Sequence, residues 1–300
     1  MSWLLIAILS YFLFAVVVFG DKYLLKGLMP SPKVYAFYVG TFGILALALI
    51  PFGFSIPTPL VIFLALLAGA SHILGTLFYF NGLQRFDTSR VVLAIGAMAP
   101  LFTFGLTYLF LGGEATLSLK GIVAFILLIS GSTLITWEKD KKFTLESFKY
   151  SALAAIFFSL YYVLSKLVYL EQPFISGFIW SRFGAFLLAI ILFFSKEVRE
   201  ELFVKKKSFN LKTWGVFLPV EVGAASGFIL QNWAIALAGT ASLALVSALG
   251  GVQYVFVLIF AILLSLKFPQ ILKEQISGKI IFQKILAILL IGAGLALVAL

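Results

Sequence analysis

Three ionisable side chains lie inside long apolar runs of this sequence, where a charge is costly and usually serves a purpose. Glu221 is the only acid clearly inside such a run. A charge at membrane depth costs ~2.5 kcal/mol or more and usually faces a cavity or a partner. Glu221 could therefore exchange protons or bind a substrate amine. It could equally lie at the membrane surface, because Trp214, two turns earlier, is of the residue type found in the headgroup belt.

The other two ionisable residues are Arg182 and His72. The planar fork of Arg182 matches a substrate carboxylate, but the same side chain could pair with Glu221 or extend to the outer surface. His72 is the only histidine of the chain. Histidine titrates near neutral pH, which suits proton coupling, whereas a single histidine in a helix often bonds to a neighbouring helix instead. When the two halves of the chain are aligned, Glu221 matches Gly69, three residues before His72. The two side chains could therefore face each other at similar depth.

Polar and aromatic side chains in the apolar runs are further candidates for substrate contact, although each is also typical of helix–helix contacts. They are Tyr79, Asn81, Gln231, Asn232, Trp233, Gln253 and Tyr254. Pro100 removes a helical hydrogen bond and is expected to kink its helix near Gly96. Gly250 and Gly251 are expected to give a weaker break, through low helix propensity. Carbonyl groups freed at such breaks could line a cavity.

The elements that must position these residues are apolar runs long enough to cross a bilayer. The chain is 62% hydrophobic and 11% charged, with a mean hydropathy of +1.13. This composition is typical of an all-α integral membrane protein with one membrane domain. We expect ten transmembrane helices, at Ser2–Phe19, Val34–Phe52, Leu60–Gly82, Val91–Leu111, Gly121–Trp137, Phe148–Leu167, Phe174–Phe194, Trp214–Leu237, Ser242–Leu266 and Lys284–Leu300.

The ends of the first three runs depend on charge and proline. The first run lacks a basic segment before it, so we interpret it as a retained helix and not as a cleaved signal peptide. It is expected to end at Asp21-Lys22, which leaves no acid inside it. The second and third runs share a charge-free stretch, which Pro51, Pro57 and Pro59 are expected to break.

Basic residues predict the orientation of the helices. Of the 22 Lys and Arg residues, 19 lie in the alternate loops that follow the first, third, fifth, seventh and ninth runs. The positive-inside rule places those loops in the cytoplasm. Both termini are then expected outside the cytoplasm, with the protein in the cell (inner) membrane.

The two halves of the chain, residues 1–142 and 143–300, resemble each other. Phe42-Gly43 matches Phe183-Gly184, Asp87-Thr88 matches Gly239-Thr240, and a further match joins residues 127–131 to 289–293. Each half has five runs, and two successive copies with an odd number of spans lie in opposite orientations. This pattern predicts two inverted five-helix repeats with a site near the midplane.

The sequence resembles the drug/metabolite transporter superfamily, in its EamA-like branch, over nearly its whole length. The resemblance rests on Pro100, on Leu111-Gly112-Gly113-Glu114 with Gly121, and on Arg182-Phe183. Three features depart from that family: Thr41 in place of an arginine, Gly250-Gly251 in place of a second proline, and the basic segment Lys267–Lys284. The resemblance implies a ten-helix carrier, often an exporter, that moves a small polar or amphipathic metabolite such as an amino acid by alternating access.

Several other functions lack their sequence features. There is no HExxH, P-loop or GxSxG motif, no pair of clustered carboxylates and no cysteine, so we expect no metal, cofactor or enzyme activity. The net charge of +10 is explained by orientation, so no nucleic-acid partner is expected. A flippase for a lipid-linked intermediate remains an alternative, and an intramembrane enzyme would need an acid/base cluster. The expected partners are the small-molecule substrate and the lipid bilayer, with the chain as a monomer or homodimer.

Overall fold

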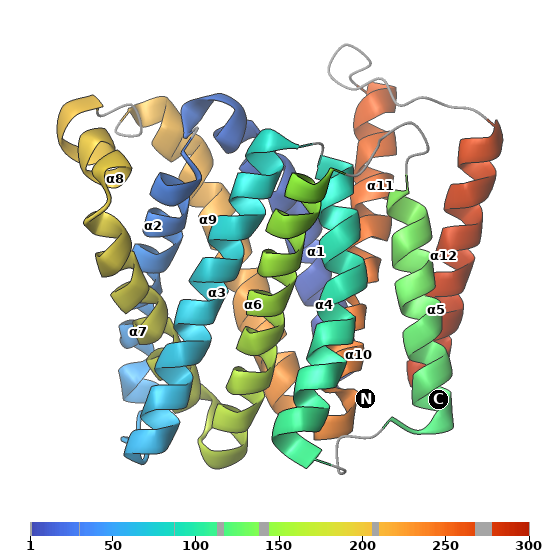
Figure 1. The fold of residues 1–300 in the computed structure, drawn as a ribbon, viewed down its shortest axis with the longest axis horizontal. Helices are drawn as coiled ribbons and strands as arrows, with labels where there is room; N and C mark the ends of the chain where they lie inside the picture. The colour runs from blue at the N-terminus through green and yellow to red at the C-terminus, as the bar shows by residue number, and fades with distance from the viewer. Residues whose placement is uncertain are drawn as a thin grey trace.

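The computed structural model describes residues 2–29, 31–86, 88–112, 117–137, 144–205, 210–267 and 278–299. These residues form helices and contain no strand (Figure 1). Ten of the helical segments are long and apolar enough to cross a membrane. The prediction of an all-α, multi-pass membrane protein is therefore confirmed.

Each half of the described chain supplies five of the ten spans. The first five are α1 (Ser2–Tyr23), α2 (Pro32–Phe42) with a following 3-10 helix (Gly43–Phe52), α3 (Pro59–Arg85), α4 (Thr88–Leu111) and α5 (Leu119–Thr136). The second five are α6 (Leu145–Glu171), α7 (Phe174–Phe193), α9 (Leu211–Leu237), α10 (Leu243–Ala248) continued by α11 (Gly250–Lys267), and α12 (Gly278–Ala299). A short α8 (Lys196–Glu200) lies between α7 and α9.

Helix starts follow local sequence signals. The side chains of Ser31, Ser118, Thr144 and Asn210 each accept a hydrogen bond from a backbone N–H three residues later, at 2.7–3.4 Å. Such caps satisfy donors that the first helical turn leaves free. The second and third spans are separated where prolines were expected to break them: the 3-10 helix contains Pro51 and ends at Phe52, and α3 begins at Pro59.

Two spans extend further than the sequence indicated. The first continues through Asp21 to Tyr23 and then into a π-helical turn, Leu24–Leu28, so Asp21 lies within the helical segment. The sequence placed Asp21 at the end of this span, and the structure places it in the last turn of α1, followed by further helical residues. α6 reaches Glu171, four residues beyond the expected end at Leu167, and contains Lys166. Asp87, Gly113, Glu114 and most of the Lys267–Lys284 segment lie outside the described residues.

The interruption of the helix lies beside the glycine pair and not at Pro100. α4 is uninterrupted from Thr88 to Leu111 with Pro100 inside it. The ninth span divides at Leu249, between α10 and α11. Gly251 is needed there for packing, because a Cβ at this position would lie 1.9 Å from the Ser132 hydroxyl of α5. The glycine pair therefore allows a close approach of helices as well as a break.

Glycines also set the other main helix contacts. α1 packs along α9, α3 along α6 and α7, and α5 along α12. A Cβ at Gly69 would lie 1.8 Å from the Ser181 carbonyl oxygen, and one at Gly184 would lie 2.2 Å from the Leu66 carbonyl oxygen. At this crossing the backbones of α3 and α7 touch, as small residues permit in membranes.

The core of the protein surrounds α6. In the apolar part of α6, 56% of residues are buried, against 17% in that of α12, which lies beside α5 at the edge of the molecule. The two ends of the chain lie at the same end of the helices, opposite α8 (Figure 1). The core therefore positions α3, α6, α7 and α9 side by side, and these helices carry most of the candidate residues.

Candidate functional site

Two carboxyl groups lie at the same level on α1 and α9. The helices meet closely there, since a Cβ at Gly20 would lie 2.1 Å from Val220 Cγ2. Asp21 is buried and accepts a hydrogen bond from the Tyr35 hydroxyl of α2. Glu221 interacts electrostatically with Asp21, and no described residue gives it a hydrogen bond. Glu221 is the eleventh of the 27 residues of α9, and this depth favours the interpretation of Glu221 as a residue inside the span.

Two tyrosines complete this region. Tyr35 stacks on Phe80 with ring centroids 4.3 Å apart. Tyr35 also lies within electrostatic range of Glu221. Tyr79 of α3 lies within electrostatic range of Asp21. We call Asp21, Tyr35, Tyr79 and Glu221 the acidic cluster. Four separate helices contribute to it, and Asp21 and Tyr35 were not among the residues expected from the sequence.

Arg182 lies near the middle of α7 with incomplete hydrogen bonding. Its side chain is 7% exposed. Its Nη2 donates one long hydrogen bond, 3.5 Å, to the Val39 carbonyl oxygen, while its Nη1 is buried with no partner among the described residues. The guanidinium carbon lies 4.7 Å from the centroid of the Phe228 ring. Arg182 and Glu221 interact electrostatically, but within the described chain they form no ion pair.

His72 lies at the middle of α3 and contacts the same phenylalanine. The centroids of the His72 and Phe228 rings are 4.4 Å apart. The Nδ1 atom of His72 is buried and has no hydrogen-bond partner in the described part of the chain. His72 also lies within electrostatic range of Arg182. Phe228 of α9 thus contacts two basic side chains, each with an unused nitrogen. We call these three residues the arginine site.

A hydrogen-bonded group of residues from α6 and α9 lies next to the arginine site. Asn232 Oδ1 accepts hydrogen bonds from Tyr161 at 2.5 Å and from Tyr169 at 2.8 Å. The Asn232 Nδ2 donates to the Phe228 carbonyl oxygen at 2.8 Å. Asn232 therefore ties α6 to α9, which is the helix–helix role that the sequence left open for it.

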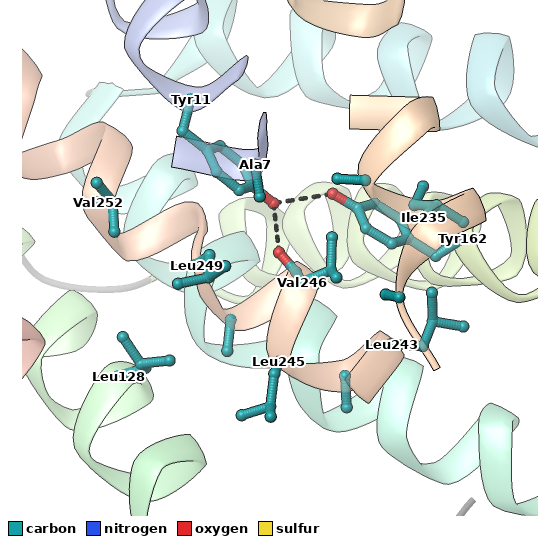
Figure 2. Packing of buried hydrophobic residues seen from close by; sticks show 14 of the residues in the cluster. Ala7, Tyr11, Leu128, Tyr162, Ile235, Leu243, Leu245, Val246, Leu249 and Val252 are labelled. Atoms are coloured by element: carbon teal, nitrogen blue, oxygen red, sulfur yellow. Dashed lines mark hydrogen bonds between the residues drawn. The ribbon is translucent and has the colours of Figure 1, made fainter. Parts of the chain in front are cut away.

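A second bonded group joins α1, α6 and α10 (Figure 2). The Tyr11 hydroxyl donates to the Val246 carbonyl oxygen at 2.8 Å and lies 2.9 Å from the Tyr162 hydroxyl. Val246 precedes the break at Leu249, so Tyr11 satisfies one of the carbonyl groups that the end of α10 leaves without a helical partner. Gln231 is buried and interacts with Tyr11.

Lys166 is the second cation buried within the spans. Its Nζ donates to the carbonyl oxygens of Ala236 at 3.1 Å and Ala238 at 2.5 Å. These carbonyl groups end α9, where a cation is favoured by the helix dipole. The ammonium group of Lys166 is thus provided with acceptors by the protein itself.

The remaining candidates from the sequence lie apart from the arginine site. The side chain of Asn81 donates to the Leu77 carbonyl oxygen of its own helix at 2.7 Å. Trp233 is 46% exposed and stacks on Phe174. The Tyr254 hydroxyl donates to the Val92 carbonyl oxygen at 3.2 Å, and Gln253 beside it is partly buried. Among the described residues, no group of three metal-binding side chains comes together.

Comparison with known proteins places the fold among solved structures. No family model and no curated protein matches the chain. A protein of known crystal structure is similar over 99% of this chain and 96% of its own, with a TM-score of 0.66 and 19% identity. At this identity the similarity concerns the fold alone. The arrangement of the helices is therefore one that an experimentally determined protein also adopts.

Proposed function

We propose that the chain is a secondary carrier of the drug/metabolite transporter type, most simply an exporter, that moves a small polar or amphipathic metabolite such as an amino acid. Alternating access would expose the site to one side of the membrane and then to the other. The two halves, residues 1–142 and 143–300, would be inverted repeats. The site would consist of the acidic cluster and the arginine site.

The observation that carries this proposal is the incomplete pairing of charged groups within the apolar spans. Asp21, Glu221 and Arg182 come from three different helices, yet no ion pair joins any two of them in the described chain. Charges at such depth usually serve an ion or substrate pathway. A purely structural bundle would gain stability by pairing or replacing them.

The helix pairing supports the repeat. If α1, α2, α3, α4 and α5 correspond to α6, α7, α9, α10–α11 and α12, then the contact of α1 with α9 corresponds to that of α6 with α3. Both contacts are extensive. The contact of α4 with α6 likewise corresponds to that of α11 with α1, and α5 meets its own counterpart α12. A site between inverted repeats is typical of carriers.

Transport across a range of pH tests this function. Purified protein in liposomes preloaded with a mixture of amino acids should exchange them for tritiated amino acids outside. Glu221→Gln and His72→Ala should alter the pH dependence of net transport, while Glu171→Gln, at an exposed helix end, serves as the control. Absence of exchange for every compound class tried, with folded protein, would contradict the proposal. Wild-type pH dependence in both variants would remove these two residues from the coupling.

Orientation can be tested with single cysteines, since the chain has none. Lys212 and Glu171 are exposed at opposite ends of the helices. We expect Glu171→Cys to react with an impermeant thiol reagent in whole cells and Lys212→Cys to react only after the cells are opened. The reverse pattern would contradict the proposed placement of both termini outside the cytoplasm.

A further inference from the structure

We propose that the arginine site, Arg182 with His72 and Phe228, is the subsite for a single carboxylate group of the ligand. This inference rests on the proposed function, which it deepens by naming the chemical group that the ligand must carry. Arg182 Nη1 and His72 Nδ1 would be the two donors, and the Phe228 ring would hold the guanidinium plane.

Arg182 has a buried hydrogen-bond donor, Nη1, that no described residue uses. Buried polar groups in proteins nearly always have hydrogen-bond partners, and a buried charge without one is costly. Only 7% of Arg182 is exposed, yet its Nη1 has no partner among the described residues. Lys166, in the same half of the chain, shows the usual arrangement, with two carbonyl acceptors. The acceptor that Arg182 lacks is therefore expected to come from outside the protein.

The surroundings of Arg182 hold its guanidinium in place without neutralising it. The Phe228 ring lies 4.7 Å from the guanidinium carbon, a cation–π distance. In the 3-10 helix that follows α2, a Cβ at Gly43 would lie 3.0 Å from Nη2, so the glycine leaves room for the head group. The charged and titratable groups around it are Glu221 on α9, His72 on α3, and Tyr161 and Tyr169 on α6. None of them forms an ion pair or hydrogen bond with Arg182 in the described chain.

His72 gives the second donor position. Its ring packs on the same phenylalanine, with centroids 4.4 Å apart, and its buried Nδ1 is also without a partner among the described residues. The two unused nitrogens thus come from α3 and α7, and both belong to side chains that contact the Phe228 ring. The tight crossing of α3 and α7 at Gly69 and Gly184 fixes the two helices relative to each other.

The charge balance favours a carboxylate over a phosphate. One arginine can compensate one negative charge, and its fork matches the two oxygens of a carboxylate. A phosphate dianion would bring a second charge close to Glu221 and Asp21, which are already within electrostatic range of each other, and uncompensated buried charge is strongly unfavourable. The acidic cluster instead suits a neutral or cationic part of the same ligand.

Thermal shifts of the purified wild-type protein in detergent test the subsite. The probes are the common amino acids, their carboxamides, their decarboxylated amines, and inorganic phosphate. We expect at least one amino acid to raise Tm, with its carboxamide and amine giving no shift and phosphate none. Arg182→Gln should weaken binding of that amino acid about tenfold or more, as expected for loss of a charge-assisted hydrogen bond, and Arg182→Lys should retain part of it. Arg85→Gln, an exposed arginine, is the control and should bind as wild type.

The ligand-free Tm of Arg182→Gln gives a second measurement that needs no ligand. If Arg182 awaits a ligand, its removal should leave this Tm unchanged or higher. A fall of several degrees that Arg182→Lys restores would assign Arg182 to structure and overturn the subsite. Equal shifts from an acid and its amide, or a shift from phosphate, would also overturn it. Binding without any exchange in liposomes would contradict the proposed carrier but leave the subsite standing, whereas exchange that Arg182→Gln does not change would contradict the subsite alone.

Discussion

The contact of α3 with α7 and that of α2 with α9 would be equivalent under the proposed repeat, yet they are built differently. In the first, a Cβ at Gly69 or Gly184 would lie 1.8 or 2.2 Å from a carbonyl oxygen of the other helix. In the second, aromatic rings separate the helices. The Tyr38 and Trp214 centroids are 5.7 Å apart, and those of Phe42 and Phe217 are also 5.7 Å apart.

The difference teaches which contact can change. Backbones in direct contact can separate only by losing the whole crossing, because no side chain lies between them to adjust. Rings can move past one another with changes of rotamer, at a cost of about 0.5–1.5 kcal/mol for each aromatic pair lost. For the proposed carrier we therefore expect the α2–α9 contact to open and the α3–α7 contact to stay closed while it holds the arginine site.

A cross-link across α2 and α9 should have the largest effect. The chain has no cysteine, so Tyr38→Cys with Phe217→Cys gives two unique thiols. A bifunctional, reducible thiol reagent should lower exchange in liposomes at least about tenfold, because a step that must open is blocked, and reductant should restore it. The two single variants treated with the same reagent are the controls. Full exchange in the cross-linked protein would show that this contact does not open.

The next effect is expected at the α3–α7 crossing. Gly69→Ala should destabilise the protein by about 1–3 kcal/mol, as inserting a group into a packed core does, because the new Cβ would meet the Ser181 carbonyl oxygen. Gly215→Ala is the matched control, since nothing lies within 4 Å of a Cβ at that position. A fall in Tm for Gly69→Ala only is the expected result. Equal Tm values for the two variants would mean that the crossing is not tight.

The smallest effect is expected when one aromatic ring between α2 and α9 is replaced by a smaller side chain. Phe217 is fully buried and contacts Tyr35, Tyr38, Phe42 and Trp214. Phe217→Leu should lower Tm less than Gly69→Ala does, since it removes ring contacts and not a backbone contact. It should also speed exchange, because fewer ring pairs must separate. Slower exchange in this variant would indicate that the rings guide the opening and do not resist it.

The ten spans could be predicted from the sequence because hydropathy and proline breaks are local properties. Asp21 was not predicted as a site residue, because its partner is not a local neighbour in the sequence. A span was ended at its first charged residue, whereas the partner that keeps Asp21 inside the helix, Tyr35, lies on the following helix. The pattern that could have revealed it is the continued apolar stretch after Lys22, Tyr23-Leu24-Leu25, of which Leu24 and Leu25 are buried.

The candidate site was predicted only in its residue types. Arg182, His72 and Glu221 were each singled out, but whether Arg182 pairs with Glu221 depends on distances between α7 and α9 that no local pattern contains. Asn81 and Trp233 illustrate the reverse error, in which a polar or amphipathic side chain in a span suggests a ligand contact. One bonds to its own helix and the other is 46% exposed.

Lys166 offers a way to observe movement of the end of α9 relative to α6 in the proposed carrier. Its amine is enclosed by the end of α9, with 4% of the residue exposed. An amine-reactive footprinting reagent should therefore modify the surface lysines rapidly and Lys166 slowly. Any state in which α9 moves away from α6 would release this amine, so the labelling rate of one peptide, followed by mass spectrometry, reports that motion in unaltered protein.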